Sequence, residues 1–501
     1  MEKVRFYITG SMLYNLVQCP HRLYLDLFGD PSKKDPESKF LQMLWERGTL
    51  FEQEVIRGLK IPFTDLSGKS GYERERLTKE AIERGDSLIY AGRIRAGNLL
   101  GDPDILRREG EGWVAGDIKS GAALEGVNEG SEGRIKEHYA VQLALYTDIL
   151  ERMGISAGRL PFIWDIHGEE VVYNLQEPVG KRDKRRIWNL YKEHLEFAER
   201  IINRRWKTTP AMVGVCKLCH WRSYCYARME EMDDLSLIPE CGRSRRDAMV
   251  GYFRTVSELA RTSIDSILSG EKTLIKGVGK NLLQRFYERA RLQKTPGAKP
   301  HLKQPLKLPD SNCELFMDIE TDPMRDICYL HGFVERYDHD NNTERYVPFF
   351  AENPTPDSER RAFSEAWAYV QSRQPCIVYY YSKYERTWWY RLQERYPEVV
   401  ARGEVEALFS PVRSVDLYYD VVQSHTEWPT RDYSIKTLAR YLGFSWRDQN
   451  PSGVESIEWY YRWVESGDEG IRKRILEYNE DDCKAMRVIL DAIPAMEIRY
   501  N

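Results

Sequence analysis

The sequence lacks long apolar runs. No run in its 501 residues approaches the length of roughly 20 apolar residues that is needed to span a bilayer. Its first residues, MEKVRFYITGSMLYNLVQCPHRL, lack the apolar core and cleavage site of a signal peptide. An excess of one charge is also lacking, because 74 Lys and Arg balance 78 Asp and Glu. We therefore expect a cytoplasmic protein of two or three domains with no membrane partner.

Cysteine is scarce, with nine residues in the chain. Inside a cell thiols stay reduced, so a tight group of cysteines indicates a metal rather than a disulfide. Five cysteines are scattered, several of them in apolar runs such as PCIVYYY. We interpret these five as small buried apolar side chains; they are Cys241, Cys313, Cys328, Cys376 and Cys483.

The segment CKLCHWRSYC places Cys216, Cys219 and Cys225 close enough to surround one ion. A fourth ligand is needed, and His220 is poorly placed because it directly follows Cys219. Cys19, in LVQCPHRLYLD, is the other candidate. Four thiolates suit either tetrahedral zinc or a [4Fe-4S] cluster, and the spacing does not separate the two.

A nuclease-like set of residues lies between these cysteines. GDPDIL supplies Asp104, and WVAGDIKS supplies Asp117 and Lys119, in a region that predicts consecutive hairpin strands. Paired carboxylates can hold Mg²⁺ or Mn²⁺ against a scissile phosphate, and a lysine on the same strand face can stabilise developing charge or orient water. HYAVQLALYTDIL predicts a helix whose Gln142 and Tyr146 share a face and can reach the same site.

This order of motifs, closed by one N-terminal and three C-terminal cysteines, resembles the RecB-like nucleases of the PD-(D/E)XK superfamily. Within them it is most similar to the iron–sulfur branch of the AddB nuclease domain and the CRISPR-associated RecB-like exonuclease. The resemblance implies that Cys19, Cys216, Cys219 and Cys225 ligate a structural [4Fe-4S] cluster rather than zinc.

One position departs from that family, which has a histidine metal ligand three residues after a glycine in its first helix. Here Gly48 is followed by Phe51 at that place. Glu52 either substitutes as a ligand or is an exposed acid on an amphipathic helix. An altered or inactive metal site is therefore an alternative.

A second set of acids begins at LFMDIETDP, where strand alternation places Asp318 and Glu320 on one face. CIVYYYSKYERTWWYRL predicts a buried strand followed by a helix, with Glu385 near the junction. RKRILEYNEDDCKAMRVILDAI predicts a helix that presents Tyr478 and Asp482 on one face. The four acids predict a site for two metal ions about 4 Å apart, with Tyr478 holding the nucleophilic water.

These motifs resemble the DEDDy branch of the RNase H-like exonucleases, in particular the RNase H-like domain that accompanies many RecB-like nucleases. Glu385 stands where that branch usually has aspartate. We interpret Asp416, in RSVDLYYDVV, as peripheral support rather than a ligand. For Lys436, in YSIKTLARYLGF, we favour a solvated side chain over contact with a nucleic-acid backbone.

The segments around LIPECGRS and LIKGVGKN resemble tandem helix-hairpin-helix units, with Glu240 where the first would have glycine. In the second, Gly277 and Gly279 free backbone N–H groups for a phosphate, and Lys276 and Lys280 flank the turn. Lys272 to Lys307 holds ten Lys and Arg against one acid. We expect its first part to contact nucleic acid and KTPGAKPHLKQPLKLPD to be a flexible linker.

The expected architecture is α/β, in three parts. Residues 1–232 form a PD-(D/E)XK nuclease domain with an iron–sulfur staple, 233–305 a helix-hairpin-helix module and basic linker, and 306–501 an RNase H-like 3′–5′ exonuclease domain. We expect a nuclease acting with Mg²⁺ or Mn²⁺ on DNA ends or single strands in repair, recombination or defence. Its expected partner is a helicase or another repair or defence protein. The alternatives are a nucleic-acid-binding scaffold with one or both sites inactive, and a zinc-containing RNA-processing exonuclease.

Overall fold

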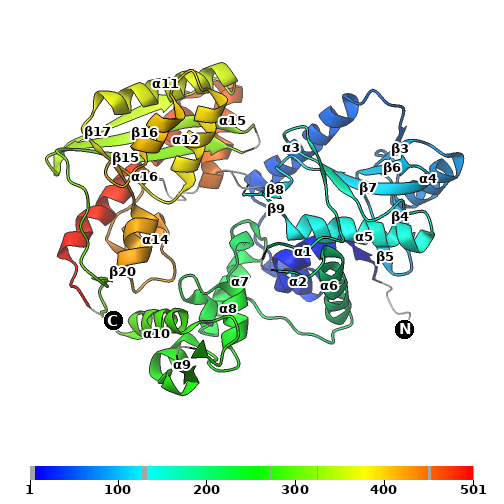
Figure 1. Cartoon of the computed structure of the whole chain (residues 1–501), viewed down its shortest axis with the longest axis horizontal. Coiled ribbons are helices and arrows are strands. Elements are labelled where there is room, and N and C mark those ends of the chain that lie inside the picture. The colour runs from blue at the N-terminus through cyan, green and yellow to red at the C-terminus, as the bar shows by residue number, and fades with distance from the viewer. Residues whose placement is uncertain are drawn as a thin grey trace. The chain divides into compact units, whose positions relative to one another are not determined.

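The computed structural model describes residues 6–126, 133–181, 183–270, 272–323, 325–448 and 453–499. The chain divides into two compact units, which we call the N-terminal unit (Met1–Tyr226) and the C-terminal unit (Ala227–Asn501). Figure 1 shows both units, which are described separately below. No helix among the described residues is both long and apolar enough to traverse a bilayer.

The N-terminal unit is built on a mixed sheet with the strand order β11-β10-β7-β6-β3-β2. The sheet packs against α5, a largely buried helix that also contacts α1 and α6. β6 and β7 form the expected antiparallel hairpin, and β10 lies parallel to β7. The helices are α1 (Gly10–Gln18), α2 (Pro20–Phe28), α3 (Lys39–Arg57), α4 (Gly71–Arg84), α5 (Glu137–Met153), α6 (Ile187–Ile202) and α7 (Arg222–Glu231), with 3-10 turns η1 (Pro31–Lys33) and η2 (Gly214–Leu218).

The strands of this unit are short, and their hairpin register sets the positions of the acids. Ile105 pairs with Gly116, so Asp104 and Asp117 meet at the same end of the hairpin. Gly116 is required there, since a Cβ would lie 2.4 Å from Phe162 Cε2. The strands are β1 (Ile8–Thr9), β2 (Thr64–Asp65), β3 (Leu88–Tyr90), β4 (Ile94–Ala96), β5 (Leu99–Gly101), β6 (Ile105–Glu109), β7 (Gly112–Ile118), β8 (Leu124–Glu125), β9 (Arg134–Ile135), β10 (Phe162–Trp164) and β11 (Glu170–Val172).

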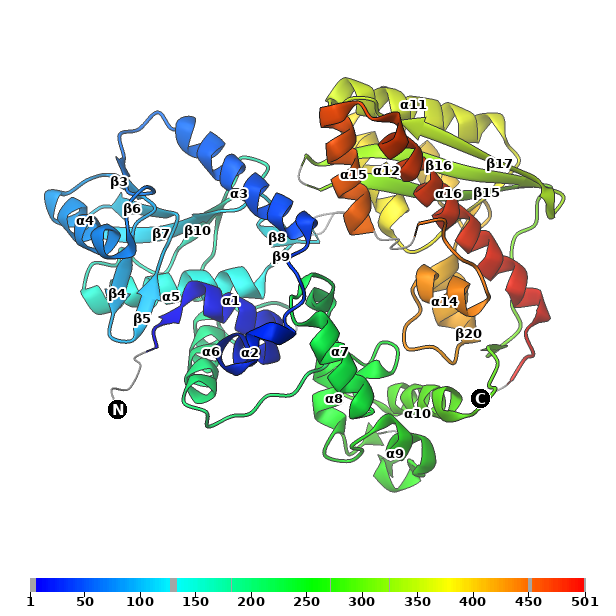
Figure 2. The same ribbon diagram turned by 180° about the vertical axis from the view of Figure 1, so that it is seen from behind.

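The C-terminal unit contains a mixed sheet with the order β17-β16-β15-β18-β19. β15, β16 and β17 are antiparallel neighbours, whereas β18 and β19 run parallel to β15. Helices α11 and α12 cover one face, and α15 and α16 cover the other (Figure 1; from behind, Figure 2). The strands are β15 (Cys313–Asp322), β16 (Ile327–Tyr337), β17 (Asp340–Phe350), β18 (Ile377–Tyr380) and β19 (Ser414–Asp416).

Side-chain alternation along β15 decides which residues reach the site. Leu315, Met317 and Ile319 pack in the apolar core beneath α11 and α12. Asp318 and Glu320 therefore point to the opposite face, toward α16. The helices of the sheet region are α11 (Pro356–Ser372), α12 (Tyr384–Arg395), α13 (Arg402–Leu408), α14 (Ile435–Tyr441), α15 (Gly453–Ser466) and α16 (Glu469–Ala492), with a π-helix η5 (Leu417–Gln423) and a 3-10 turn η6 (Ile493–Ala495).

The residues expected to form a separate hairpin module and linker belong to this same compact unit. They have their own small apolar core, which includes Leu235, Phe253 and Phe286. His301 and Leu302, within the expected linker, form β14, which pairs with β20. The elements are η3 (Leu235–Leu237), α8 (Gly242–Met249), α9 (Val256–Arg261), η4 (Asp265–Ile267), β12 (Leu268–Ser269), β13 (Lys272–Thr273), α10 (Lys280–Lys294), β14 (His301–Leu302) and β20 (Thr426–Glu427).

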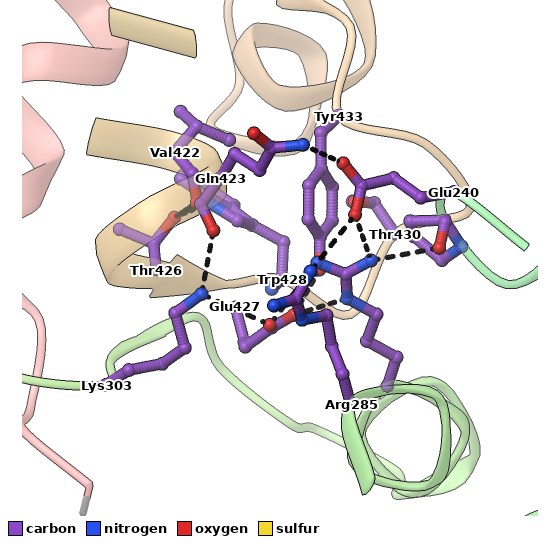
Figure 3. Close-up of polar contacts among 12 residues, drawn as sticks. Glu240, Arg285, Lys303, Val422, Gln423, Thr426, Glu427, Trp428, Thr430 and Tyr433 are labelled. Carbon is purple, nitrogen blue, oxygen red and sulfur yellow. Dashed lines mark hydrogen bonds and ion pairs between the residues drawn. The ribbon is translucent and has the colours of Figure 1, made fainter. Parts of the chain in front are cut away.

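A buried ionic joint fastens α10 to the sheet region. The fully buried Arg289 guanidinium lies 2.8 Å from Glu427 Oε2 and 2.8 Å from Glu240 Oε2. Tyr433 donates a 2.5 Å hydrogen bond to Glu427, and Gln423 donates one to Glu240. Figure 3 shows Glu240, Gln423, Glu427 and Tyr433 converging, with Lys303 beside them. Because a buried charge without its partner is costly, this joint holds the helical module against the sheet region.

The five scattered cysteines are all buried, as predicted. Cys328 and Cys483, for example, are 0% exposed.

Candidate functional site

Three carboxylates of the C-terminal unit converge. One oxygen each from Asp318, Glu320 and Asp482 lies within 4.8 Å of the others, a spacing that could hold a divalent ion. Asp318 and Glu320 come from β15 and Asp482 from the buried face of α16. Oxygen ligands of this kind are those preferred by Mg²⁺ and Mn²⁺.

Glu385 faces this cluster from the first turn of α12. Its side chain is 4% exposed, and Oε2 accepts no hydrogen bond among the described residues. A buried carboxylate oxygen that accepts no hydrogen bond is suited to bind a cation. The oxygens of these four acids therefore fit a bound metal ion. Asp416 lies nearby, but its Oδ1 accepts hydrogen bonds from the backbone N–H groups of Ser382, Tyr418 and Tyr419.

Burial, followed by the charges of neighbouring acids, raises the pKa values of the acids in this cluster. Burial and the Asp482 carboxylate raise the pKa of Glu320 to about 8. Burial, Asp482 and Glu320 raise the pKa of Asp318 well above its usual range. Burial also raises the pKa of Glu385, with Asp416 and Asp482 adding to the effect. A divalent cation would relieve this repulsion.

The structure corrects the interpretation of Lys436 as a solvated lysine. Its Nζ donates a 2.6 Å hydrogen bond to the Tyr478 hydroxyl and lies 3.9 Å from Asp482 Oδ2. Burial, followed by Asp482, raises the pKa of Tyr478 well above its usual range, so the hydroxyl keeps its proton. Lys436 is therefore a cation held against the acid cluster.

Sequence reasoning missed Asn479, which neighbours Tyr478 on α16. The fully buried amide donates a 2.7 Å hydrogen bond to Asp318 Oδ2 and accepts one from Tyr346. Gly332 of β16 makes room for it, because a Cβ there would lie 1.6 Å from Asn479 Oδ1. The sequence feature that could have pointed to this contact is Gly332 itself. It stands among the bulky residues of ICYLHGFVERY, and a glycine within a strand often marks the close approach of another group.

The N-terminal unit brings together its own predicted acids and lysine. The Asp104 backbone N–H donates to Asp117 Oδ1 at 3.4 Å, and Lys119 Nζ lies 2.9 Å from Asp117 Oδ2. Burial and Asp117 raise the pKa of Asp104 to about 8. Burial by itself would lower the pKa of Lys119, but Asp117 and Asp104 outweigh it and raise that pKa.

Gln142 and Tyr146 meet on α5, where the amide donates a 2.9 Å hydrogen bond to the tyrosine hydroxyl. The hydroxyl in turn lies 3.4 Å from the carbonyl oxygen of Asp102, two residues before Asp104. Gly10 permits this packing, since a Cβ there would lie 2.9 Å from the Tyr146 hydroxyl.

Phe51 and Glu52 of α3 have different surroundings. Phe51 packs against the apolar cluster that contains Ile105 and Ile118. Glu52 forms a side-chain hydrogen bond with Tyr90 and is near enough to Asp104 for its charge to help raise the pKa of that acid, after burial and Asp117. The carboxylate that could replace the histidine of the family pattern therefore lies in the neighbourhood of these acids.

The four cysteines predicted as cluster ligands come from the two ends of the N-terminal unit. Cys19 joins α1 to α2, Cys216 lies in η2, Cys219 directly follows it, and Cys225 is on α7. Burial raises the pKa of Cys219, and Cys19 and Cys216 are close enough to raise it further. Cys19, from the start of the unit, and Cys219, from near its end, therefore lie close together.

His220 has another partner, since its Nε2 lies 2.7 Å from Asp26 Oδ1. Trp221 donates to the same Asp26 oxygen at 2.8 Å, and the Ser223 N–H donates to Asp35. These contacts join α2 and the segment after it to the cysteine-bearing segment.

The two hairpin turns of the helical module differ. In the second, Ile275 and Val278 are buried, Gly277 has φ +82° and Gly279 caps α10, while Lys276 is exposed. Lys280 begins α10. In the first, Glu240 has φ +63°, a conformation that favours glycine.

Comparison with known families gives two matches, one in each half of the chain. Residues 30–226 match the model of the PD-(D/E)XK nuclease superfamily, and residues 315–493 match that of the RNase H superfamily. The chain carries domains of two nuclease superfamilies. The RNase H-like match contains Asp318, Glu320, Glu385, Tyr478 and Asp482, and the PD-(D/E)XK match contains Asp104, Asp117 and Lys119. No curated protein matches the chain significantly.

Proposed function

We propose that the chain is a metal-dependent nuclease whose RNase H-like domain removes nucleotides from the 3′ ends of DNA. The observation that carries this proposal is the convergence of Asp318, Glu320 and Asp482 with the buried, unbonded Glu385 Oε2. Mg²⁺ or Mn²⁺ at such carboxylates activates a water and neutralises the scissile phosphate.

The residues of the chain prepare that chemistry. Asn479 holds one oxygen of Asp318, and Trp446 donates a 2.7 Å hydrogen bond to Asp482 Oδ1, so both carboxylates are oriented. The protonated Tyr478 hydroxyl, fixed by Lys436, can bind the attacking water or a phosphate oxygen. The tyrosine at this position supports the DEDDy type of exonuclease.

DNA ends or single strands are the proposed substrate, in repair, recombination or defence. The turn around Gly277, with exposed Lys276 and the N-terminus of α10, supports phosphate contact by a helix-hairpin-helix element. The first hairpin is not proposed to contact phosphate. Its turn residue Glu240 is acidic and forms an ion pair with Arg289.

The N-terminal site is proposed as a second, weaker nuclease. Asp104, Asp117 and Lys119 are assembled, but Phe51 cannot coordinate a metal and Glu52 supplies an oxygen in place of nitrogen. Oxygen ligands favour harder ions such as Mg²⁺ and Mn²⁺.

Cys19, Cys216, Cys219 and Cys225 are proposed as ligands of a [4Fe-4S] cluster that staples this unit. Anaerobically purified protein should then hold about four irons per chain and absorb broadly near ~400 nm. Cys219→Ser should bleach that absorbance, whereas Cys241→Ser, at a cysteine buried in the core of the helical module, should leave it unchanged. Stoichiometric zinc without iron would reject the cluster.

The nuclease proposal is tested with end-labelled single- and double-stranded DNA and RNA in Mg²⁺ or Mn²⁺. Asp318→Asn should reduce 3′-end removal at least ~100-fold, the scale of losing a main electrostatic stabiliser. Asp117→Asn should remove only a weaker activity. If Asp318→Asn cleaves like wild type while Asp117→Asn abolishes all cleavage, the N-terminal unit is the working nuclease.

A further inference from the structure

A surface hollow of about 320 Å³ in the RNase H-like domain is lined in part by Trp446, a residue that also contacts the acid cluster. It is lined by Arg440 of α14 and by the loop that follows that helix, including Phe444, Trp446 and Asp448. The Trp446 indole N–H that donates to Asp482 Oδ1 connects the hollow to the site. Pockets of about this volume are large enough for small organic ligands.

The walls of the hollow combine aromatic rings with a cation. The rings of Phe444 and Trp446 meet edge to face, with centroids 4.9 Å apart and planes at 83°. The Arg440 guanidinium lies 5.6 Å from the centroid of Trp446. Asp448 is neutralised by Arg474, whose Nε lies 2.5 Å from Asp448 Oδ2, so its charge opposes an anion only weakly.

The loop is fixed in place before any ligand binds. Gly443 ends α14 with φ +90°, and the Phe444 N–H returns to the carbonyl of Ala439 at 2.9 Å. Trp446 binds Asp482, and the next residue, Arg447, binds Asp481 through its backbone N–H and its guanidinium. Two successive loop residues are thus attached to two successive acids of α16.

Helix α14 packs beside α16 (Figure 2) and carries two basic residues, Lys436 and Arg440. Lys436 and Arg440 are four residues apart and therefore share a face, about 6 Å apart along the helix axis. Lys436 reaches Tyr478 at the acid cluster, while Arg440 reaches the hollow.

We propose that the hollow is a nucleobase subsite, in which a base adjoining the scissile phosphate stacks on Phe444 while Arg440 meets a phosphate of the strand. Aromatic rings and an arginine bind the π-face and backbone of any nucleotide, so the subsite accepts all four bases in an unpaired strand. The inference rests on the proposed function, because it names the substrate form that the same acid cluster receives.

The subsite is tested first by binding, with the catalytic ions replaced by Ca²⁺ to slow cleavage. A single-stranded oligonucleotide carries 2-aminopurine at the 3′-terminal or the penultimate position. Stacking should quench its fluorescence in wild type at one of these positions. Phe444→Ala should lose that quenching and weaken binding roughly tenfold, whereas Phe444→Tyr should retain both.

Cleavage gives the second readout. An abasic residue at the sensitive position should slow wild type roughly tenfold and leave the already slowed Phe444→Ala unaffected. Arg440→Ala, at an exposed position, should weaken binding to every strand. Tyr72→Ala, at an exposed aromatic of the N-terminal unit, serves as the control.

The two proposals fail differently. Quenching that persists in Phe444→Ala, or no effect of an abasic residue at either position, overturns the subsite. Quenching that depends on Phe444 without any Asp318-dependent cleavage overturns the exonuclease and keeps the subsite. An absence of strand binding by the wild-type protein overturns both.

Discussion

The ammonium of Lys436 donates a 2.6 Å hydrogen bond to the hydroxyl of Tyr478. The two residues come from α14 and α16, which pack together across 42 positions of sequence. The contact sets a cation and a protonated phenol at the edge of the acid cluster. It thereby orients the Tyr478 hydroxyl, which we propose to hold water or phosphate.

Replacing Lys436 with methionine should slow 3′-end removal on the order of tenfold or more, because Tyr478 loses its orienting donor. The carboxylates themselves remain, so stabilisation of the protein by Mn²⁺ should persist. Single-turnover cleavage and thermal denaturation with and without Mn²⁺ measure the two effects. An unchanged cleavage rate would mean that Lys436 does not contribute to cleavage.

Gly332→Ala should lower the free energy of unfolding by about 1–3 kcal/mol, since the added methyl overlaps the Asn479 amide that holds Asp318. Its cleavage rate should fall as well. Gly403→Ala is the matched control, because a Cβ at this helical glycine meets nothing within 4 Å. The control should be neutral or more stable by about 0.4–1 kcal/mol, and equal effects of both variants would contradict the account.

Glu240 holds a backbone conformation that favours glycine while its side chain binds Arg289. Glu240→Ala and Glu240→Gly both lose the ion pair, but only glycine relieves the positive φ. Chemical denaturation should therefore show Glu240→Gly to be more stable than Glu240→Ala by about 1 kcal/mol. The opposite order would mean that the strain is absent.

The stability of the C-terminal unit should depend on pH through its acids. Glu320 has its pKa raised from 4.5 to about 8, so it contributes stability that is full below 4.5 and lost as pH rises through about 8. Metal binds the ionised form, and Mn²⁺ should therefore raise the midpoint of thermal unfolding more near pH 8.5 than near pH 6. Asp318→Asn should abolish most of this difference, whereas a wild-type shift independent of pH would contradict the assignment.

Much of each site follows from local pattern. Alternation in LFMDIETD places Asp318 and Glu320 on one face of β15, and helical periodicity places Tyr478 and Asp482 together on α16. The antiparallel register of β6 and β7 likewise places Asp104 beside Asp117. These features depend on residues close in sequence.

The contacts that sequence reasoning missed are those between distant elements. Lys436 reaches Tyr478 only because α14 packs on α16, and a single helix carries no sign of that packing. In the sequence, Glu240 marks a degenerate hairpin turn. Its ion pair with Arg289 and its hydrogen bond with Gln423 form only in the folded protein. Asn479 is one polar residue among several in EYNEDD, and only the fold selects it.

The most direct test of the RNase H-like centre replaces a non-bridging oxygen of the scissile phosphate with sulfur. Mg²⁺ binds sulfur poorly and the softer Mn²⁺ binds it better, so a direct metal contact becomes visible in the rate. The account predicts that cleavage of at least one phosphorothioate diastereomer falls about tenfold or more in Mg²⁺ and recovers in Mn²⁺, with no recovery in Asp318→Asn. Equal slowing by sulfur in both ions, or recovery without Asp318, would contradict it.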